Sequence, residues 1–219
     1  DVTGSVPTAM INKNILALPL EERMYKSVSG TETLLSTTLT NYVQSGNLIV
    51  RNNIQASTGT ATPETRILFN QYNTNGNILE QQKASDARQS YIWDYNGEYP
   101  IAQVINAAQA DIAYTSFEAE GKGNWTFTGD PVPDFTTPSG KKAYNLISGS
   151  LTKSVTSVNT YIISYWRPTS LSALTIAGTQ TGYPVTGQTV NGWKCYEHRV
   201  SGITTATLNG SGLIDEVRL

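Results

Sequence analysis

Few residues in this sequence have the types and spacing that catalysis requires. The chain contains one cysteine and one histidine, Cys195 and His198. They are three residues apart in an alternating stretch, so in a straight strand they point to opposite faces and cannot act as nucleophile and base. We expect Cys195 to be a small strand residue and His198 to be a polar, outward-facing one.

Acidic residues close together in the sequence are the other possible source of chemistry. Asp130 and Asp134 flank Pro-Val-Pro, and Glu21 is followed by Glu22. A glycosidase needs two carboxyl groups that face each other across a cleft, and these spacings fix no such geometry. No glycine-rich phosphate loop follows a strand and precedes a helix. The sequence therefore favours a protein that is not an enzyme.

The composition is that of a turn-rich β protein. The 219 residues include 48 Ser and Thr, 17 Asn and 18 Gly, while charged residues make up 15% and the net charge is -2. This balance argues against nucleic-acid binding by a clustered basic surface. No apolar run approaches the ~18–20 residues of a membrane span. We expect one or two domains in a secreted or cell-surface setting.

The N-terminal half is expected to form β-hairpins. Residues 1–20 are predicted to be an extended lead-in, and residues 33–50 two strands. Residues 52–65 are predicted to be a polar loop. Tight turns follow at Asn75-Gly76 and Asn96-Gly97, because both residue types tolerate positive φ.

The C-terminal half is expected to form an antiparallel sandwich. Asn106 is predicted to cap a short helical spacer over 107–113. From residue 114, short strands alternate with Gly, Pro and Asn turns about every 8–12 residues. The predicted strands include 161–166, 172–177, 193–200, 204–208 and 213–219.

Two strings in the hairpin region carry a family resemblance. They are Tyr72-Asn73-Thr74-Asn75-Gly76-Asn77-Ile78 and Tyr91-Ile92-Trp93-Asp94-Tyr95-Asn96-Gly97-Glu98-Tyr99-Pro100-Ile101-Ala102. About residues 10–106 resemble the Rhs/YD-repeat family, and the second string looks like a segment of secreted Rhs-like proteins of Bacteroidetes-type bacteria. This resemblance implies an N-terminal β-hairpin domain over 1–106.

Other strings carry a second resemblance, over about residues 114–219. They are Ser116-Phe117-Glu118-Ala119-Glu120-Gly121, Gly123-Asn124-Trp125, Gly140-Lys141-Lys142-Ala143-Tyr144, Gly192-Trp193 and Ile214-Asp215-Glu216-Val217. This region is similar to a jelly-roll carbohydrate-binding module of the calcium-containing kind. The resemblance implies an all-β fold, a hairpin region followed by a jelly-roll sandwich, whose first and last strands run side by side.

The second resemblance implies a structural calcium site where those strands meet. Calcium takes oxygen ligands, and the implied side-chain ligands are Glu118 and Asp215, with Glu120 as a third. Asp215 and Glu216 alternate along a predicted strand, so we expect only one of them to be a ligand.

The same resemblance implies a glycan-binding surface, since sugar C–H faces stack on aromatic rings. Trp125 and Trp193 match family positions inside the sandwich. Alternation along 161–166 turns one of Tyr165 and Trp166 outward. The candidate glycan contacts are therefore Tyr165, Trp166 and the loop residue Tyr183.

The function expected from these features is that of a non-catalytic secreted or cell-surface module, a fragment of a larger Rhs-like protein. Its calcium-stabilised jelly roll would bind a polysaccharide, a cell-surface glycan or another surface. Two alternatives stay open. One is a structural stalk or filament subunit that self-assembles by β-edge pairing. The other is a scaffold piece of a toxin-encapsulating Rhs shell.

Overall fold

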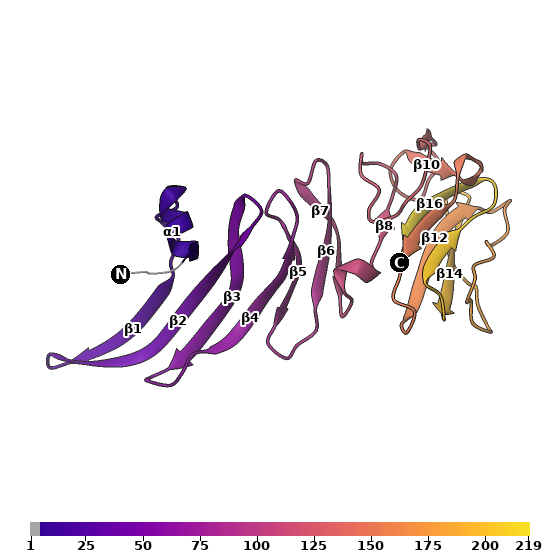
Figure 1. Ribbon diagram of the computed structural model, residues 1–219. Coiled ribbons are helices and arrows are strands. Elements are labelled where there is room, and N and C mark those ends of the chain that lie inside the picture. The colour runs from indigo at the N-terminus through magenta and orange to yellow at the C-terminus, as the bar shows by residue number, and fades with distance from the viewer. Residues whose placement is uncertain (1–4) are drawn as a thin grey trace. The chain divides into compact units, whose positions relative to one another are not determined.

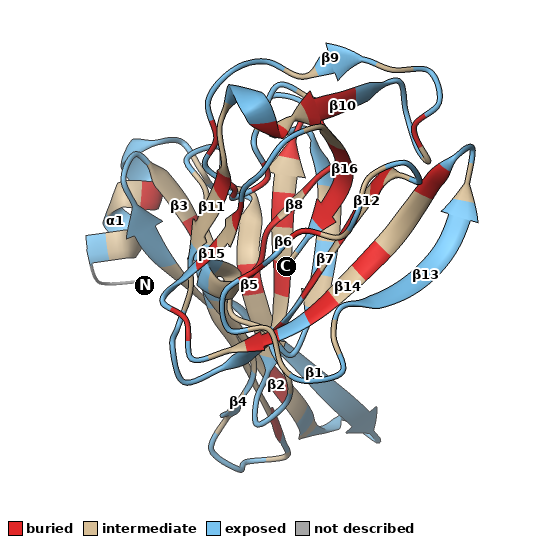
Figure 2. Ribbon diagram, turned by 90° about the vertical axis from the view of Figure 1, so that its right-hand side faces the viewer, coloured by how far each residue is buried: buried red, intermediate tan, exposed pale blue. Residues whose placement is uncertain are grey.

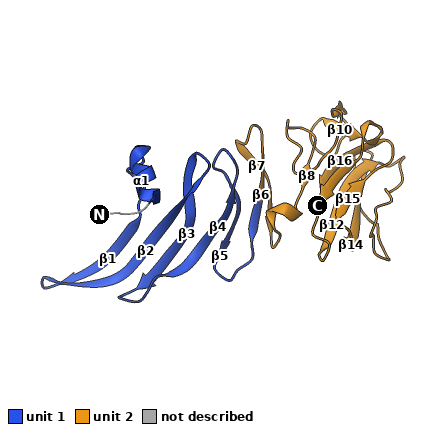
Figure 3. Ribbon diagram, viewed as in Figure 1, with its two compact units in different colours: residues 1–90 blue, residues 91–219 orange. Residues whose placement is uncertain are grey.

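The computed structural model describes residues 5–219, and antiparallel strands form most of it (Figure 1). The chain divides into two compact units, residues 1–90 and 91–219 (Figure 3). The all-β prediction, with hairpins preceding a sandwich, is confirmed. Each unit is described by itself below.

The first unit is a meander in which each strand pairs with the one before it. Its elements are α1 (Ser5–Asn12), β1 (Glu21–Val28), β2 (Thr31–Ser45), β3 (Leu48–Thr58), β4 (Glu64–Tyr72), β5 (Ile78–Lys83) and the start of β6 (Gln89–Asp94). Strands β4 and β5 are joined through the turn at Asn75-Gly76, as predicted. This unit buries few large apolar side chains, Met10 and Val50 among its described residues.

Two predictions for this unit are wrong. Residues 5–12 are helical rather than extended; residues 1–4 of the expected lead-in lie outside the described part. The polar stretch from residue 52 continues β3 as far as Thr58. The polar side chains of this stretch pair across the strands: Asn41 Nδ2 donates to the side chain of Asn53 at 2.8 Å and to that of Gln55 at 3.4 Å.

The second unit carries the sandwich. The end of β6 and β7 (Tyr99–Ile105) come first, followed by the 3₁₀ turn η1 (Gln109–Asp111). One sheet has the order β13 (Val185–Val190), β14 (Trp193–Ser201), β12 (Thr160–Pro168), β16 (Leu213–Arg218), β10 (Lys142–Asn145) and β9 (Val132–Pro133), and β8 (Tyr114–Thr115) also pairs with β16. A second sheet pairs β11 (Leu151–Ser154) with β15 (Thr205–Leu208), and η2 (Leu146–Ser148) precedes β11.

The region before the sandwich differs from expectation. The helix predicted over 107–113 is reduced to one 3₁₀ turn, because Ala113 exchanges backbone hydrogen bonds with Leu219. The units divide after Ser90, not near residue 106. Within the second unit, Asp94 accepts the N–H of Gly121 at 2.9 Å. Residues 172–177, predicted as a strand, form none.

The core of the sandwich lies between its two sheets. Along β12, Tyr161, Ile163 and Tyr165 are buried in turn, as a strand with one core-facing side requires. Trp125, predicted to be internal, is part of this core. The Phe117 and Tyr144 rings stack at 5.5 Å.

Candidate cation-binding site

A bulge in β16 turns two consecutive acids toward the same face. Trp166 lies opposite Asp215 and Ser164 opposite Arg218, so two residues of β16 face the single residue Tyr165. Glu216 has φ 49°, a left-handed value that accommodates the extra residue. Ile214 and Val217 both belong to the core, whereas Asp215 and Glu216 do not. The expectation that the two acids face opposite sides is therefore wrong.

Asp215 is the least satisfied charged group of the described residues. It has 0% exposure, and neither carboxylate oxygen receives a hydrogen bond of normal geometry. Burial, reinforced by the charges of Glu216, Glu118 and Asp134, raises the pKa of Asp215 to about 8, and the nearby N–H of Glu216 offsets this only in part. A buried carboxylate without a partner is costly unless a proton or a cation neutralises it.

Glu118 reaches the same place from the start of the sandwich. Strand β8 pairs with β16, with Thr115 opposite Val217, so the side-by-side first and last strands implied by the resemblance are confirmed. Glu118 Oε1 accepts the backbone N–H groups of Lys141 at 2.7 Å and Lys142 at 2.6 Å. These bonds fix one carboxylate oxygen of Glu118, whose negative charge acts on Asp215.

Glu216 differs from its neighbour because protein groups satisfy it. Its carboxylate accepts hydrogen bonds from Tyr114 at 3.1 Å, from Arg218 at 2.7 Å and from Ser139. Burial and the Glu216 charge raise the pKa of Tyr114 to about 12. Glu216 is thus a structural anchor, whereas the carboxylate oxygens of Asp215 have no such partners.

A segment of residues 129–141, here called the covering loop, includes the short strand β9 and is fixed to this face by hydrogen bonds of Thr136 and Ser139. Asp134 Oδ1 accepts the N–H of Thr136 at 2.8 Å and its hydroxyl at 2.6 Å. The Thr136 hydroxyl in turn accepts Trp193 Nε1–H at 3.0 Å. Trp193 was expected inside the sandwich, but it is buried at 1% exposure outside the core cluster, beneath this loop.

These acids do not form a ready-made cage. Within residues 5–219, no three His, Cys, Asp or Glu side chains are grouped as metal ligands. Glu120, an expected ligand, is exposed, and its carboxylate accepts the N–H of Asn96. Backbone N–H groups lower the pKa of Glu120. The residues that fit a cation best are Asp215 and Glu118, and the charges of Glu118 and Asp134 both act on Asp215.

The expected glycan contacts are placed very differently from one another. Tyr165 has 0% exposure, and its hydroxyl accepts the N–H of Leu174 at 2.7 Å, so it offers no ring face to a sugar. Trp166 is half-buried and lies opposite Asp215, on the same face of the sheet. Tyr183 is half-buried in the loop before β13. Phe135 of the covering loop, not expected from the sequence, is 78% exposed.

Cys195 and His198 do not form a catalytic pair. His198 is 1% exposed, so the outward orientation predicted for it is wrong. Its Nε2 shares a hydrogen bond with the Tyr165 hydroxyl at 2.9 Å, and its Nδ1 shares one with the Thr179 hydroxyl at 3.0 Å. Burial raises the pKa of the Cys195 thiol, which disfavours a reactive thiolate.

Comparison with known proteins adds no relative. The chain matches no protein-family model, and searches of curated proteins and of solved structures give no match. In residues 5–219 no helix has the length and apolar character needed to span a membrane.

Proposed function

We propose that the chain is a non-catalytic secreted or cell-surface module, part of a Rhs-like protein, whose sandwich binds calcium and, through the face beside that ion, a glycan. The observation that carries the proposal is the unpartnered carboxylate of Asp215, buried at 0% exposure. Calcium binds carboxylate, carbonyl and hydroxyl oxygens with flexible geometry, so an incomplete set of side chains is compatible with it.

In this proposal Asp215 and Glu118 hold the ion. Bound calcium supplies positive charge that neutralises the buried acids. Glu118 is held in place by the N–H groups of Lys141 and Lys142, and the ionised form of Asp215 is stabilised. The site connects β16 with the segment that follows β8. Calcium would therefore stabilise the sandwich by joining segments that are far apart in the sequence.

The glycan part of the proposal rests on aromatic side chains near this site. Phe135 lies between Asp134 and Thr136, whose hydrogen bonds hold the backbone on both sides of it. A large ring that stays 78% exposed on a fixed loop can stack on the C–H face of a sugar. Trp166 is the second candidate contact, because it shares the face of Asp215.

Thermal unfolding with calcium, magnesium or a chelator tests the cation site. Binding to the folded state alone stabilises it by about 2.7 kcal/mol when free ligand is a hundredfold above Kd. We expect calcium to raise Tm of the natural chain but not of Asp215→Asn. Glu120→Gln is the matched control and should keep the full shift. A calcium shift that survives in Asp215→Asn, or no shift in the natural chain, would overturn this site.

Retention in gels that contain different polysaccharides tests glycan binding separately. We expect at least one polysaccharide to retard the natural chain, and Phe135→Ala to remove that retardation. If calcium binds and no polysaccharide retards the chain, the cation site stands and the glycan function does not.

A further inference from the structure

The strand β1 leaves one edge of the first unit open. All eight of its residues are exposed, and β1 is uniformly pale blue in Figure 2. Among residues 5–219 it pairs with β2 on one side and with no strand on the other. Such an edge presents unpaired N–H and C=O groups, which is why exposed edges are usually protected by charges.

The bulge of this hairpin does not interrupt β1. Met24 pairs with Ser36 and Tyr25 pairs with Leu34, so the extra residue is Leu35 in β2. Strand β1 therefore keeps a regular alternation from Glu21 to Val28. Its exposed side chains include Met24 at 62%, Tyr25 at 46% and Val28 at 56%, which is unusual for the solvent edge of a sheet.

The charges of β1 are complementary to themselves in one antiparallel register. Two copies can be joined into one continuous sheet by a two-fold axis perpendicular to that sheet. Paired residues of the two β1 strands then lie on the same face of the sheet, so the two residue numbers in each pair must add up to an even number. With Met24 opposite Met24 of the second copy, Glu22 faces Lys26 of that copy, and Arg23 faces its Tyr25. Opposite charges and a cation–π pair then occur twice each.

The other registers of this type either bring like charges together or leave the opposite charges unpaired. Centring the axis on Glu22 places two glutamates opposite each other, centring it on Arg23 places two arginines, and centring it on Lys26 places two lysines. Like charges directly opposite each other destabilise a strand pair. Centring it on Tyr25 avoids a like-charge pair at the axis, but Glu22 then faces Val28 and Lys26 faces Met24. The Met24 register is therefore the one in which the edge charges promote pairing.

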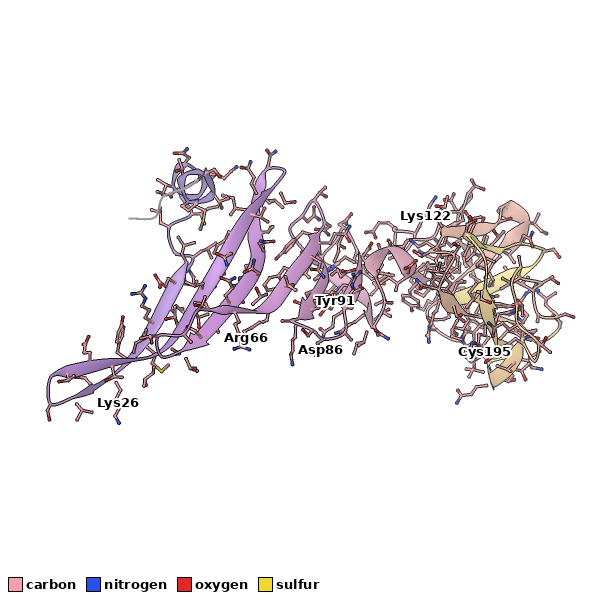
Figure 4. All side chains as sticks on the ribbon, turned by 60° about the horizontal axis from the view of Figure 1, so that its bottom comes forward. Lys26, Arg66, Asp86, Tyr91, Lys122 and Cys195 are labelled. Atoms are coloured by element: carbon pink, nitrogen blue, oxygen red, sulfur yellow. The ribbon has the colours of Figure 1, made fainter. Side chains whose placement is uncertain are left out.

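From these observations we propose that two copies of the chain associate through antiparallel pairing of β1 with β1, centred on Met24. The partner is a second copy because the sequence of β1 complements itself. Figure 4 shows Lys26 on this hairpin, its side chain directed away from the ribbon. The association does not involve Asp215 or Phe135, and it stands or falls independently of the proposed function.

Charge reversal on the full chain, measured by analytical ultracentrifugation over a range of concentrations, provides the test. We expect a monomer–dimer equilibrium for the natural chain. E22K places lysines opposite each other and K26E places glutamates opposite each other, so each should weaken association by roughly tenfold or more. E64K changes the charge at an exposed position of β4 and is the matched control.

Two further samples make the test specific: a double variant and a mixture of the two single variants. The double variant E22K/K26E restores opposite charges and should restore the dimer. A mixture of E22K with K26E should form a heterodimer, because every lysine of one chain then faces a glutamate of the other. A natural chain that stays monomeric throughout, or a dimer that single reversals leave unchanged, would overturn the proposal. The proposal would also be overturned if neither the double variant nor the mixture associated.

Discussion

Asp215 and Glu216 are adjacent in β16, point to the same face, and have opposite hydrogen-bonding states. Glu216 accepts bonds from Tyr114, Ser139 and Arg218, whereas Asp215 has no partner of normal geometry. The positive φ of Glu216 creates this arrangement. The Glu216 carboxylate therefore fixes the covering loop to the sheet through Ser139, whereas the Asp215 carboxylate holds no such contact.

The protonation of Asp215 predicts how the cation-free protein responds to pH. Its pKa is raised from the ordinary value of 3.8 to about 8, so between these values the folded state binds a proton that the unfolded chain has released. The free energy of unfolding should fall as pH rises through this window, by about 1.4 kcal/mol for each pH unit well inside it. Urea unfolding in the presence of a chelator should show this decline of the free energy of unfolding. The decline should disappear in Asp215→Asn and remain in Asp130→Asn, a control at an exposed position. Equal slopes in all three proteins would contradict it.

Gly140 is required by the position of Glu118. Its φ is 68°, and an added Cβ would lie 2.4 Å from the Glu118 carboxyl carbon. Gly140→Ala should cost about 1–3 kcal/mol of stability and weaken calcium binding, since Glu118 must move. Gly202→Ala is the matched control, because Gly202 also has φ 68° but nothing within 4 Å of an added Cβ. Chemical unfolding and calcium titration compare the two variants. A similar loss of stability and of calcium binding in both would show that the positive φ, and not the contact with Glu118, causes the effect.

His198 predicts a pH response of the opposite sign. Burial lowers its pKa from 6.5, so the folded state favours the neutral ring. Its contribution to stability is fully present above about pH 6.5 and is lost as pH falls toward the lowered pKa of the folded state, by at most about 1.4 kcal/mol for each pH unit. In the Asp215→Asn variant, the free energy of unfolding should decrease as the pH falls below about 6.5. Adding His198→Gln should remove the part of this decrease that comes from protonation of His198 in the unfolded chain. An unchanged acid response in His198→Gln would argue against the buried neutral ring.

Phe135 should be dispensable for folding. Phe135→Ala is expected to change the free energy of unfolding by less than about 0.5 kcal/mol, because the ring is mostly in water. Ile147→Ala, at a 74% exposed position of the same unit, is the control for loss of surface apolar area. Paired unfolding curves measure both changes. A much larger loss in Phe135→Ala would mean that the ring supports the covering loop instead of standing free for a ligand.

The sequence was informative where local chemistry decides the structure. The alternation over 161–166 and the turn dipeptide Asn75-Gly76 give β12 and the β4–β5 hairpin directly. Pairing between distant segments was accessible only through the Phe117-Glu118 and Ile214-Asp215 strings of the resemblance, and the β8–β16 ladder bears it out.

The remaining features depend on tertiary contacts that spacing does not encode. The bulge at Glu216 breaks the alternation from which its orientation was predicted. His198 is buried because Tyr165 and Thr179 satisfy both ring nitrogens. Asp134 and Phe135 stand in the string Pro-Val-Pro-Asp-Phe-Thr-Thr-Pro, which signals a loop but gives no sign of the face it covers.

The β8–β16 ladder also sets an order of events during synthesis. Tyr114 and Thr115 are made about a hundred residues before their partners Arg218 and Val217. The hairpins of the first unit can form as each strand is made, since their contacts are local, but closure of the sandwich must wait for its last strand. Asp215 is in that strand, so a cation could be captured only by a finished sandwich. The site would therefore form only after β16 has joined the sandwich.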